Sequence, residues 1–137
     1  MIITLCGSAS KFESDFHTAS LELGRRAIIC FTLAAFPTVS GDVSAPGQPL
    51  EESSYDKILL DLGYFHKIVK SDAVLVVGSG YIGKSTSREI LWAQMLSKPV
   101  IHQLVNDWDA IVNRLRSGRT DEHLIQKAMM VLKGNTP

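Results

Sequence analysis

The sequence predicts an α/β fold: a Rossmann-like or flavodoxin-like, doubly wound parallel sheet of four or five strands, in a single domain over residues 1–137. Three observations predict it. Short, almost wholly apolar segments alternate with segments of helical periodicity, as in a parallel sheet covered by helices on both faces. The length of 137 residues suits one domain with one core. Small-residue turns follow two of the apolar segments, where such sheets bind their ligands.

The first elements are two strands separated by a helix. Residues 2–6 form a short apolar run that ends at a glycine, which is typical of a strand. Apolar residues at helical spacing predict a helix over 12–23, which Ser10 can cap and Gly24 can end. The β-branched and aromatic run over 26–33 predicts the second strand.

A loop rich in proline and glycine, residues 37–54, separates this strand from the next helix. Long loops of this kind in compact domains are often functional or disordered. Helical periodicity then predicts a helix over 55–70, and a buried run predicts a strand over 73–77. The helix positions expected to face the core are Ile58, Leu59, Leu62, Phe65 and Val69.

The last third of the chain continues the alternation. A helix is expected over 85–97, where Pro99 stops it, followed by a strand over 100–105. Two more helices are expected, one from Asn106 or Asp107 to Arg116 and one over 121–132 capped by Thr120. With right-handed crossovers, the expected strand order is 2-1-3-4.

Charge and cysteine content exclude several classes. Fourteen basic and fourteen acidic residues give zero net charge, which does not favour nucleic-acid or membrane-surface binding. Cys6 and Cys30 lie in or beside apolar segments, and we expect reduced thiols in a cytoplasmic protein. The histidines are dispersed, so no metal is assigned, and no cofactor is implied. The N-terminus does not resemble a signal peptide, and no window approaches a membrane span.

Two segments of small residues follow the first and third strands: GSASK at 7–11 and GSGYIGKST at 78–86. The two strands end at the same edge of the sheet, so each segment leads into a helix whose N-terminal amides face a shared gap. Such amides bind anions, and we expect a phosphate site there. The candidate binding residues are Cys6, Gly7, Ser8, Ser10, Lys11, Gly78, Gly80, Tyr81, Gly83, Ser85 and Thr86.

Glu89 is the most informative acidic residue. It lies in the second turn of the helix after the glycine-rich segment, on a stripe with Trp92, Ala93 and Leu96. Helical side chains lean toward the N-terminus, so the carboxylate is expected to reach back toward the anion site. The alternative is an acid that is merely favoured by the helix dipole.

Three further polar residues are placed by counting along the elements. Asp72 begins the third strand and belongs to the opposite edge, as a turn or cap residue. A helix needs about eleven residues to cover a five-residue strand, which puts Asp61 level with the site and Tyr64 one turn lower. Asp61 is equally well read as a surface carboxylate. Asp61 and Tyr64 join Glu89 as candidate catalytic residues.

Residues 78–85 also match the Walker A pattern, G-x-x-x-x-G-K-S. A P-loop enzyme needs in addition an acidic residue at the end of a neighbouring strand to hold magnesium. The strand after the loop ends in Asn106-Asp107 after a polar Gln103, which is not a convincing apolar run ending in aspartate. A triphosphatase is therefore the least favoured interpretation, and Lys84 is read as a solvated lysine.

The sequence resembles the nucleoside 2-deoxyribosyltransferase-like family, which includes nucleoside 5′-monophosphate N-glycosidases. The resemblance lies in TLCGS near the N-terminus, a D-x-V-L-V strand, G-Y-I-G-x-S-T-x-x-E-I at 80–90 and a K-P-V strand. It covers about residues 1–105 and is most specific at 80–90. It implies a Rossmann-like fold, homodimers or larger assemblies whose neighbouring subunits help close each site, and cleavage of the N-glycosidic bond.

The resemblance also implies roles for single residues. Glu89 matches the family's nucleophile. Many members carry an aspartate where this chain has Tyr64, and Asp61, Tyr64 itself or His66 remain open as substitutes. The positions that match the family's substrate and phosphate contacts are Gly7, Ser8, Gly83, Ser85 and Thr86.

Three functions follow as hypotheses. The first is cleavage of a (deoxy)nucleoside 5′-monophosphate to free base and (deoxy)ribose 5-phosphate, or the related deoxyribosyl transfer, with the 37–54 loop and Phe36 covering the base. The second is a protein that binds a nucleotide or an ADP-ribose-like ligand without cleaving it. The third is the P-loop triphosphatase. The helices after Asn106 are the expected site of part of the subunit contacts.

Overall fold

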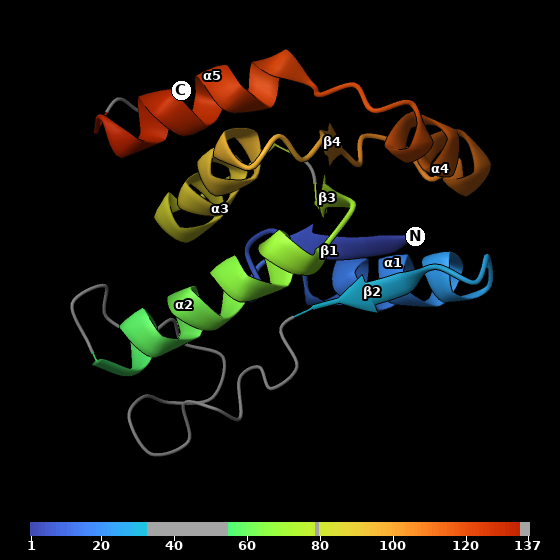
Figure 1. The fold of residues 1–137 in the computed structure, drawn as a ribbon, viewed down its shortest axis with the longest axis horizontal. Helices are drawn as coiled ribbons and strands as arrows, with labels where there is room; N and C mark the ends of the chain where they lie inside the picture. Colours follow the sequence, from blue (N-terminus) through green and yellow to red (C-terminus); the bar gives the residue numbers. More distant parts are fainter. Residues whose placement is uncertain (33–54, 79, 135–137) are drawn as a thin grey trace.

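The computed structural model describes residues 1–32, 55–78 and 80–134, which form a parallel four-stranded sheet with helices on both faces (Figure 1). The predicted fold class and the strand order β2-β1-β3-β4 are confirmed. The expected loop at 37–54 and Phe36 lie outside the described residues. The strands are β1 (Ile2–Cys6), β2 (Ile29–Phe31), β3 (Ala73–Val76) and β4 (Val100–His102). The helices are α1 (Glu13–Gly24), α2 (Tyr55–Lys70), α3 (Lys84–Met95), α4 (Trp108–Arg116) and α5 (Glu122–Leu132).

Strand side chains alternate between two faces, and each face has its own helices. Ile3 and Leu5 of β1 pack in an apolar cluster with residues of α1 and α4, such as Trp108. Cys6 lies in the other cluster, with Tyr64 of α2 and residues of α3 and α5. We call these the α1–α4 face and the α2–α3–α5 face. Helices on both faces of a parallel sheet make the fold doubly wound.

At the amino-terminal edge of the sheet, Asp72 is hydrogen-bonded to the backbone of Ile2 in β1. Its amide donates to the carbonyl oxygen of Ile2 at 2.7 Å, and its carboxylate accepts from the amide of Ile2 at 2.7 Å. Asp72 thus acts as a turn residue at the edge opposite the expected site, as the sequence predicts.

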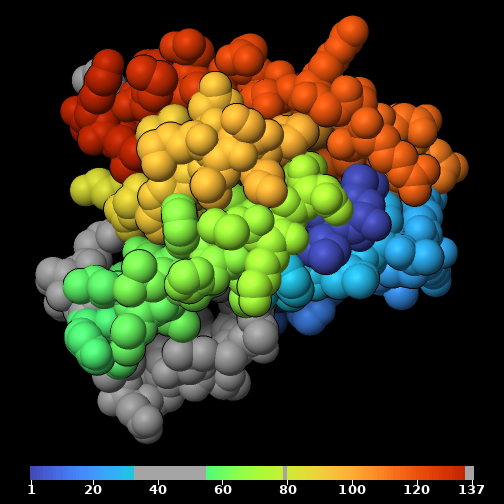
Figure 2. All heavy atoms as spheres, viewed as in Figure 1, coloured from blue at the N-terminus to red at the C-terminus, as the bar shows by residue number. Residues whose placement is uncertain are grey.

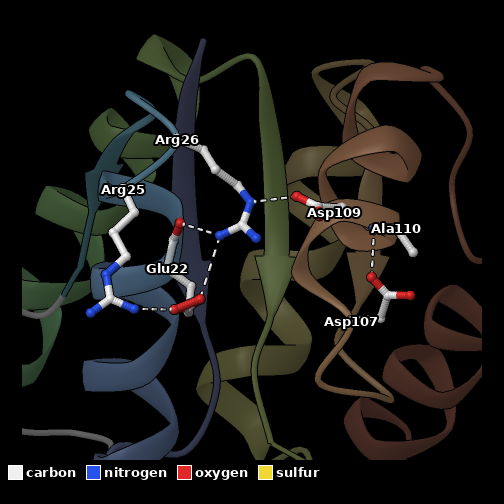
Figure 3. A network of polar contacts seen from close by, with 6 residues as sticks. All are labelled: Glu22, Arg25, Arg26, Asp107, Asp109 and Ala110. Atoms are coloured by element: carbon white, nitrogen blue, oxygen red, sulfur yellow. Dashed lines mark hydrogen bonds and ion pairs between the residues drawn. The ribbon is translucent and has the colours of Figure 1, made fainter.

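Ion pairs lie along the rim of the α1–α4 face (Figure 3). The Arg26 guanidinium donates to the Asp109 carboxylate and to the Glu22 carbonyl oxygen, each at 2.9 Å, and so joins α1 to α4. Asp109 is largely exposed, and exposed pairs of this kind stabilise a fold only weakly. At the start of α4, the Asp107 carboxylate accepts from the amide of Ala110 at 3.1 Å, which confirms Asp107 as a helix cap.

The first strand, β1, has the predicted bounds, but the other three strands are shorter than expected. β2 begins at Ile29 rather than at the start of the predicted 26–33 run, because the chain is still turning after α1: the Ile28 amide donates to Leu23 at 3.0 Å, and Ala27 has a φ of 60°. β3 and β4 end one and three residues before the predicted boundaries. The helix bounds agree with the predictions within two residues. Among the described residues, no helix is both long and apolar enough to cross a membrane.

Two predicted helix caps are wrong. Phe12 directly precedes α1, so Ser10 lies too far upstream to cap it, and its hydroxyl lies 3.5 Å from that of Ser8. The Thr120 hydroxyl accepts from the amide of Val100 at 3.2 Å instead of capping α5. Both side chains therefore support loops rather than helix ends.

The core face predicted for α2 is also wrong. The buried side chains of α2 are Tyr64 and Ile68, while Phe65 is half-buried against the ring of Trp92. Figure 2 shows α2 at the surface of the molecule. Successive helical residues are about 100° apart, so Tyr64 and Ile68 lie on a different side of α2 from the predicted positions. The predicted apolar side therefore points away from the sheet. The side chains of Ile58, Leu59, Leu62 and Val69 are between 42% and 52% exposed.

Candidate functional site

The loops after β1 and β3 meet where these two strands end, as predicted. Cys6 pairs with Val76, and the amide of Val77 donates to the Cys6 carbonyl oxygen at 2.8 Å. Gly7 and Gly78 follow these strands, with φ values of 148° and 87°. Residues other than glycine rarely adopt such values. A methyl group on Gly7 would lie 2.8 Å from the carbonyl oxygen of Val77, and one on Gly78 would lie 2.4 Å from the Phe12 ring. Only glycine permits this close approach of the two loops.

The two loops also meet through side chains. The Lys11 ammonium lies 4.5 Å from the centroid of the Tyr81 ring, a cation–π contact between the loop after β1 and the loop after β3. The Tyr81 hydroxyl lies beside Gly83, where a methyl group would come within 3.2 Å of it. Gly83 directly precedes α3, so Lys11 and Tyr81 lie close to the helix N-terminus that is expected to bind an anion.

Glu89 lies on α3 and is buried, with 5% of its surface exposed. The pKa of its carboxyl is raised to about 8, mainly by burial. A hydrogen bond with the Cys6 thiol and the charges of Lys57 and Arg88 lower this pKa, and the charge of Asp61 raises it. The structure thus gives Glu89 an unusual environment: a buried position with a thiol and two nearby cations. A carboxyl with a pKa shifted toward neutrality is typical of functional sites.

Cys6 and Tyr64 share the α2–α3–α5 face with Glu89. Burial, and then the neighbouring Glu89, raise the pKa of the Cys6 thiol well above its usual value. Burial also raises the pKa of Tyr64, and Cys6 and Glu89 add to the effect. The Tyr64 hydroxyl donates to the carbonyl oxygen of Leu5 in β1. Cys6 therefore contacts Glu89 directly, whereas the Tyr64 hydroxyl is bonded to the backbone.

Asp61 lies level with the site, as counted from the sequence, but it is a counter-ion. Its carboxylate accepts from Lys57 at 2.7 Å and from Arg88 at 3.2 Å. Lys57 also donates to the hydroxyl of Ser85, and Arg88 lies 3.4 Å from the same oxygen. Among the described residues, the cations Lys57 and Arg88 and the carboxylate of Asp61 therefore lie around Ser85, in the first turn of α3. The two cations lie where the helix dipole is also positive, and this combination favours an anion.

The remaining candidates for the binding site differ in how far they are buried. Thr86 is buried in the first turn of α3, close to Ser85, and Gly80 lies exposed in the loop before it. Ser8 is half-buried in the loop after β1, but Ser10 and Lys84 are exposed. Exposure of Lys84 agrees with its reading as a solvated lysine. Nothing in these positions assigns Ser10 a specific role at the site.

Sequence reasoning missed four residues at this edge of the sheet. Lys57 and Arg88 hold Asp61, and two residues described below, His102 and Lys127, hold the loop after β3. Lys57 precedes Asp61 by four positions, a spacing at which helical residues of opposite charge pair, so this contact was open to prediction. The other three contacts join elements far apart in the sequence.

Comparison of the chain with protein-family models, with curated proteins and with solved structures finds no match. The function therefore has to be inferred from the geometry of the site.

Proposed function

We propose that this protein is an N-glycosidase that acts on a (deoxy)nucleoside 5′-monophosphate and releases the free base and (deoxy)ribose 5-phosphate. The observation that carries the proposal is Glu89, a buried carboxyl on α3, one turn below the cations around Ser85. A phosphate bound at the N-terminus of α3 brings the sugar of the same molecule toward Glu89. The resemblance to the nucleoside 2-deoxyribosyltransferase-like family supports the same function.

The phosphate is held by the loops at the sheet edge. The first-turn amides of α3, the Ser85 hydroxyl and the cations Lys57 and Arg88 provide donors and positive charge. Lys11, near Gly83, adds a further positive charge. A free nucleoside has no phosphate group to accept hydrogen bonds from these donors. The donors at the N-terminus of α3 therefore favour a nucleoside monophosphate as the substrate.

The chemistry takes place at C1′ of the sugar. The bond between C1′ and the base nitrogen breaks, its electron pair leaves with the base, and positive charge builds on the ring oxygen and C1′. The ionised carboxylate of Glu89 stabilises that charge or bonds to C1′. Water then attacks C1′, Glu89 leaves as a carboxylate, and the proton from water is lost to solvent. Deoxyribosyl transfer follows when a second base replaces water.

The leaving base also needs a proton. The Tyr64 hydroxyl donates to Leu5, and the Asp61 carboxylate accepts from Lys57 and Arg88, so neither presents a proton to the base. In this proposal the base takes its proton from water. General acids contribute about 100-fold to 10,000-fold to such reactions, so we expect slow turnover compared with an enzyme that has one.

The proposal is tested by incubating the protein with a panel of nucleosides and nucleoside 5′-monophosphates and measuring free base by chromatography. We expect release from at least one monophosphate and much less from Glu89→Gln. Absence of free base from every compound, with wild type equal to Glu89→Gln, would exclude the glycosidase.

A second function is favoured by the bonding of Tyr64. A hydroxyl that is bonded to Leu5, at the position where the family has an aspartate, suits a protein that binds a nucleotide without cleaving it. On this alternative, nucleotides raise the melting temperature and stay intact during the measurement. Consumption of the ligand would contradict it.

We also propose a homodimer, with the exposed side of α2 as its contact. The apolar side chains of Leu59 and Leu62 belong to the helix that carries Lys57 and Asp61, so a second copy at this surface lies next to the site. The continuity with the site supports α2 over the C-terminal helices suggested by the sequence.

A further inference from the structure

The C-terminal helix α5 and the end of β4 contact the loop after β3 through two of its carbonyl groups. The Nε2–H of His102 donates to the carbonyl oxygen of Gly78 at 3.0 Å. The Lys127 ammonium donates to the carbonyl oxygen of Gly80. Both carbonyl groups belong to the segment that leads to the N-terminus of α3.

His102 is itself held in place from α5. It is buried at the end of β4, and its amide donates to the Asp121 carboxylate at 2.8 Å. Its Nδ1 lies 3.4 Å from Nε2 of His123; since Nε2–H of His102 is the donor to Gly78, the neutral ring accepts from His123 at Nδ1. Lys127 follows His123 by one helical turn, so the two contacts come from the same side of α5.

The direction from which these groups approach determines where the loop amides point. In the strand order β2-β1-β3-β4, β4 and β1 lie on opposite sides of β3, and α5 lies beyond β4 (Figure 1). The C=O and N–H of a trans peptide unit point in opposite directions. The carbonyl oxygen of Gly80 accepts from Lys127, so the N–H of Tyr81 in the same peptide unit points away from the Lys127 ammonium.

The backbone conformation of Gly78 and Gly80 is one that residues other than glycine rarely adopt. Gly78 and Gly80 have φ values of 87° and 86°, and residues in this region turn easily among several conformations. A flexible loop loses entropy when it binds a ligand, so contacts that fix it beforehand increase affinity.

We propose that Lys127 and His102 are positioning residues, which hold the carbonyl groups of Gly78 and Gly80 and so fix the segment before α3, with the N–H of Tyr81 available to an anion, before the ligand arrives. On this proposal α5 controls ligand affinity without contacting the ligand. The identity of the ligand as a phosphate rests on the proposed function, whereas the fixing of the loop does not.

The test compares Lys127→Met, which keeps the stem of the side chain, with Lys127→Arg and with Lys133→Met, a matched control on the exposed end of α5. The first readout is the backbone 15N order parameter of residues 80–83 without ligand. The second is the dissociation constant for inorganic phosphate and for a nucleoside monophosphate, measured by calorimetry, alongside the melting temperature.

For Lys127→Met we expect the order parameters of these residues to fall from about 0.85 to below about 0.6. Binding should become about tenfold weaker, the equivalent of one charge-assisted hydrogen bond. Lys127→Arg should recover most of both effects, and Lys133→Met should match wild type. Wild-type order parameters in Lys127→Met would overturn the proposal, and so would lower order parameters with unchanged affinity. If no phosphate compound binds to wild type, the proposed function fails, but lower order parameters in Lys127→Met still support the fixing of the loop.

Discussion

The two faces of the sheet contain carboxylates in opposite settings. On the α1–α4 face, the core is a cluster of apolar side chains, and Glu22 pairs at the rim with Arg25 at 2.9 Å and with Arg26 at 3.4 Å. On the α2–α3–α5 face, Glu89 is buried, and its pKa is raised to about 8. Burying an ionisable group costs free energy, so a buried carboxyl on this face supports placing the proposed site there.

The difference extends to the neighbouring polar groups. Tyr64 and His102 are buried on the α2–α3–α5 face and donate to backbone carbonyl groups next to the site. Arg26 and Asp109 of the other face lie at its rim, where the Asp109 side chain is 84% exposed. We infer that the α1–α4 face serves stability, and that the α2–α3–α5 face combines stability with chemistry.

The largest expected effect is on base release. Replacement Glu89→Gln removes the ionisable group and should lower kcat/KM for the best nucleotide by about 1000-fold or more, as for other catalytic groups that act at the reacting atom. Glu22→Gln on the opposite face is the matched control and should change it less than about twofold. Equal losses in both variants would mean that the two faces do not differ in function.

The next largest expected effect is on stability, from a substitution in the core of the α1–α4 face. Replacement Ile111→Ala truncates a buried side chain of α4 and should lower the free energy of unfolding by about 3 kcal/mol, measured in urea. The loss should be similar at pH 5 and pH 7, because no titrating group is removed. A loss that varies strongly with pH would mean that this core is coupled to the ionisable groups around Glu89. The two faces would then not differ as inferred.

Glu89 should make stability depend on pH. Folding raises its pKa from 4.5 to about 8, so the folded protein favours the protonated carboxyl. Its stabilising contribution is fully present below about pH 4.5 and is lost as the pH rises to about 8. Glu89→Gln should therefore be more stable than wild type by on the order of 3 kcal/mol at pH 7, with little difference at pH 4.5.

Urea unfolding of wild type and Glu89→Gln across this pH range measures the effect. A constant difference between the two proteins would contradict the raised pKa.

Dimerisation should be sensitive to α2 and not to α1. Leu59→Glu places a charge on the exposed apolar side of α2 and should weaken self-association by at least about tenfold, measured by sedimentation over a concentration series. Leu21→Glu changes an equally exposed apolar residue of α1 and should leave the association unchanged. A wild-type monomer at all concentrations would exclude the dimer.

The smallest effect should come from the ion pairs in Figure 3. Arg26→Ala removes the link between α1 and Asp109 and should lower the free energy of unfolding only slightly, since the partner is exposed. Thermal unfolding in low and high salt should show a smaller difference in high salt. A loss comparable to that of Ile111→Ala would show that the rim is as important as the core.

Much of the fold follows from the sequence because alternation, strand order and the position of the loops depend on local pattern. The meeting of Gly7 with Gly78, and the level of Asp61 on α2, follow from parallel strands that end at one edge. The choice of α2's buried side does not, because apolar residues surround the helix and only the neighbouring sheet selects Tyr64 and Ile68.

The candidate site was predicted in its position and only partly in its contacts. Glu89 was identified from its place on a helical stripe after a glycine-rich loop, and its catalytic role stays a prediction. Its contact with Cys6 depends on which face of β1 the thiol occupies. The contacts of Lys127 and His102 depend on how α5 folds back on the sheet, which no local pattern records.

The most direct test of the central claim, that buried Glu89 acts as a carboxylate at C1′, is the pH dependence of kcat/KM for base release between pH 6.5 and 9.5. In this range the substrate phosphate, with a second pKa of about 6, is already ionised. Since the profile reports ionisation of the free enzyme, kcat/KM should rise by about tenfold per pH unit at first and level off above about pH 8, where Glu89 is ionised. A flat profile, or a Glu89→Gln variant as active as wild type, would contradict it.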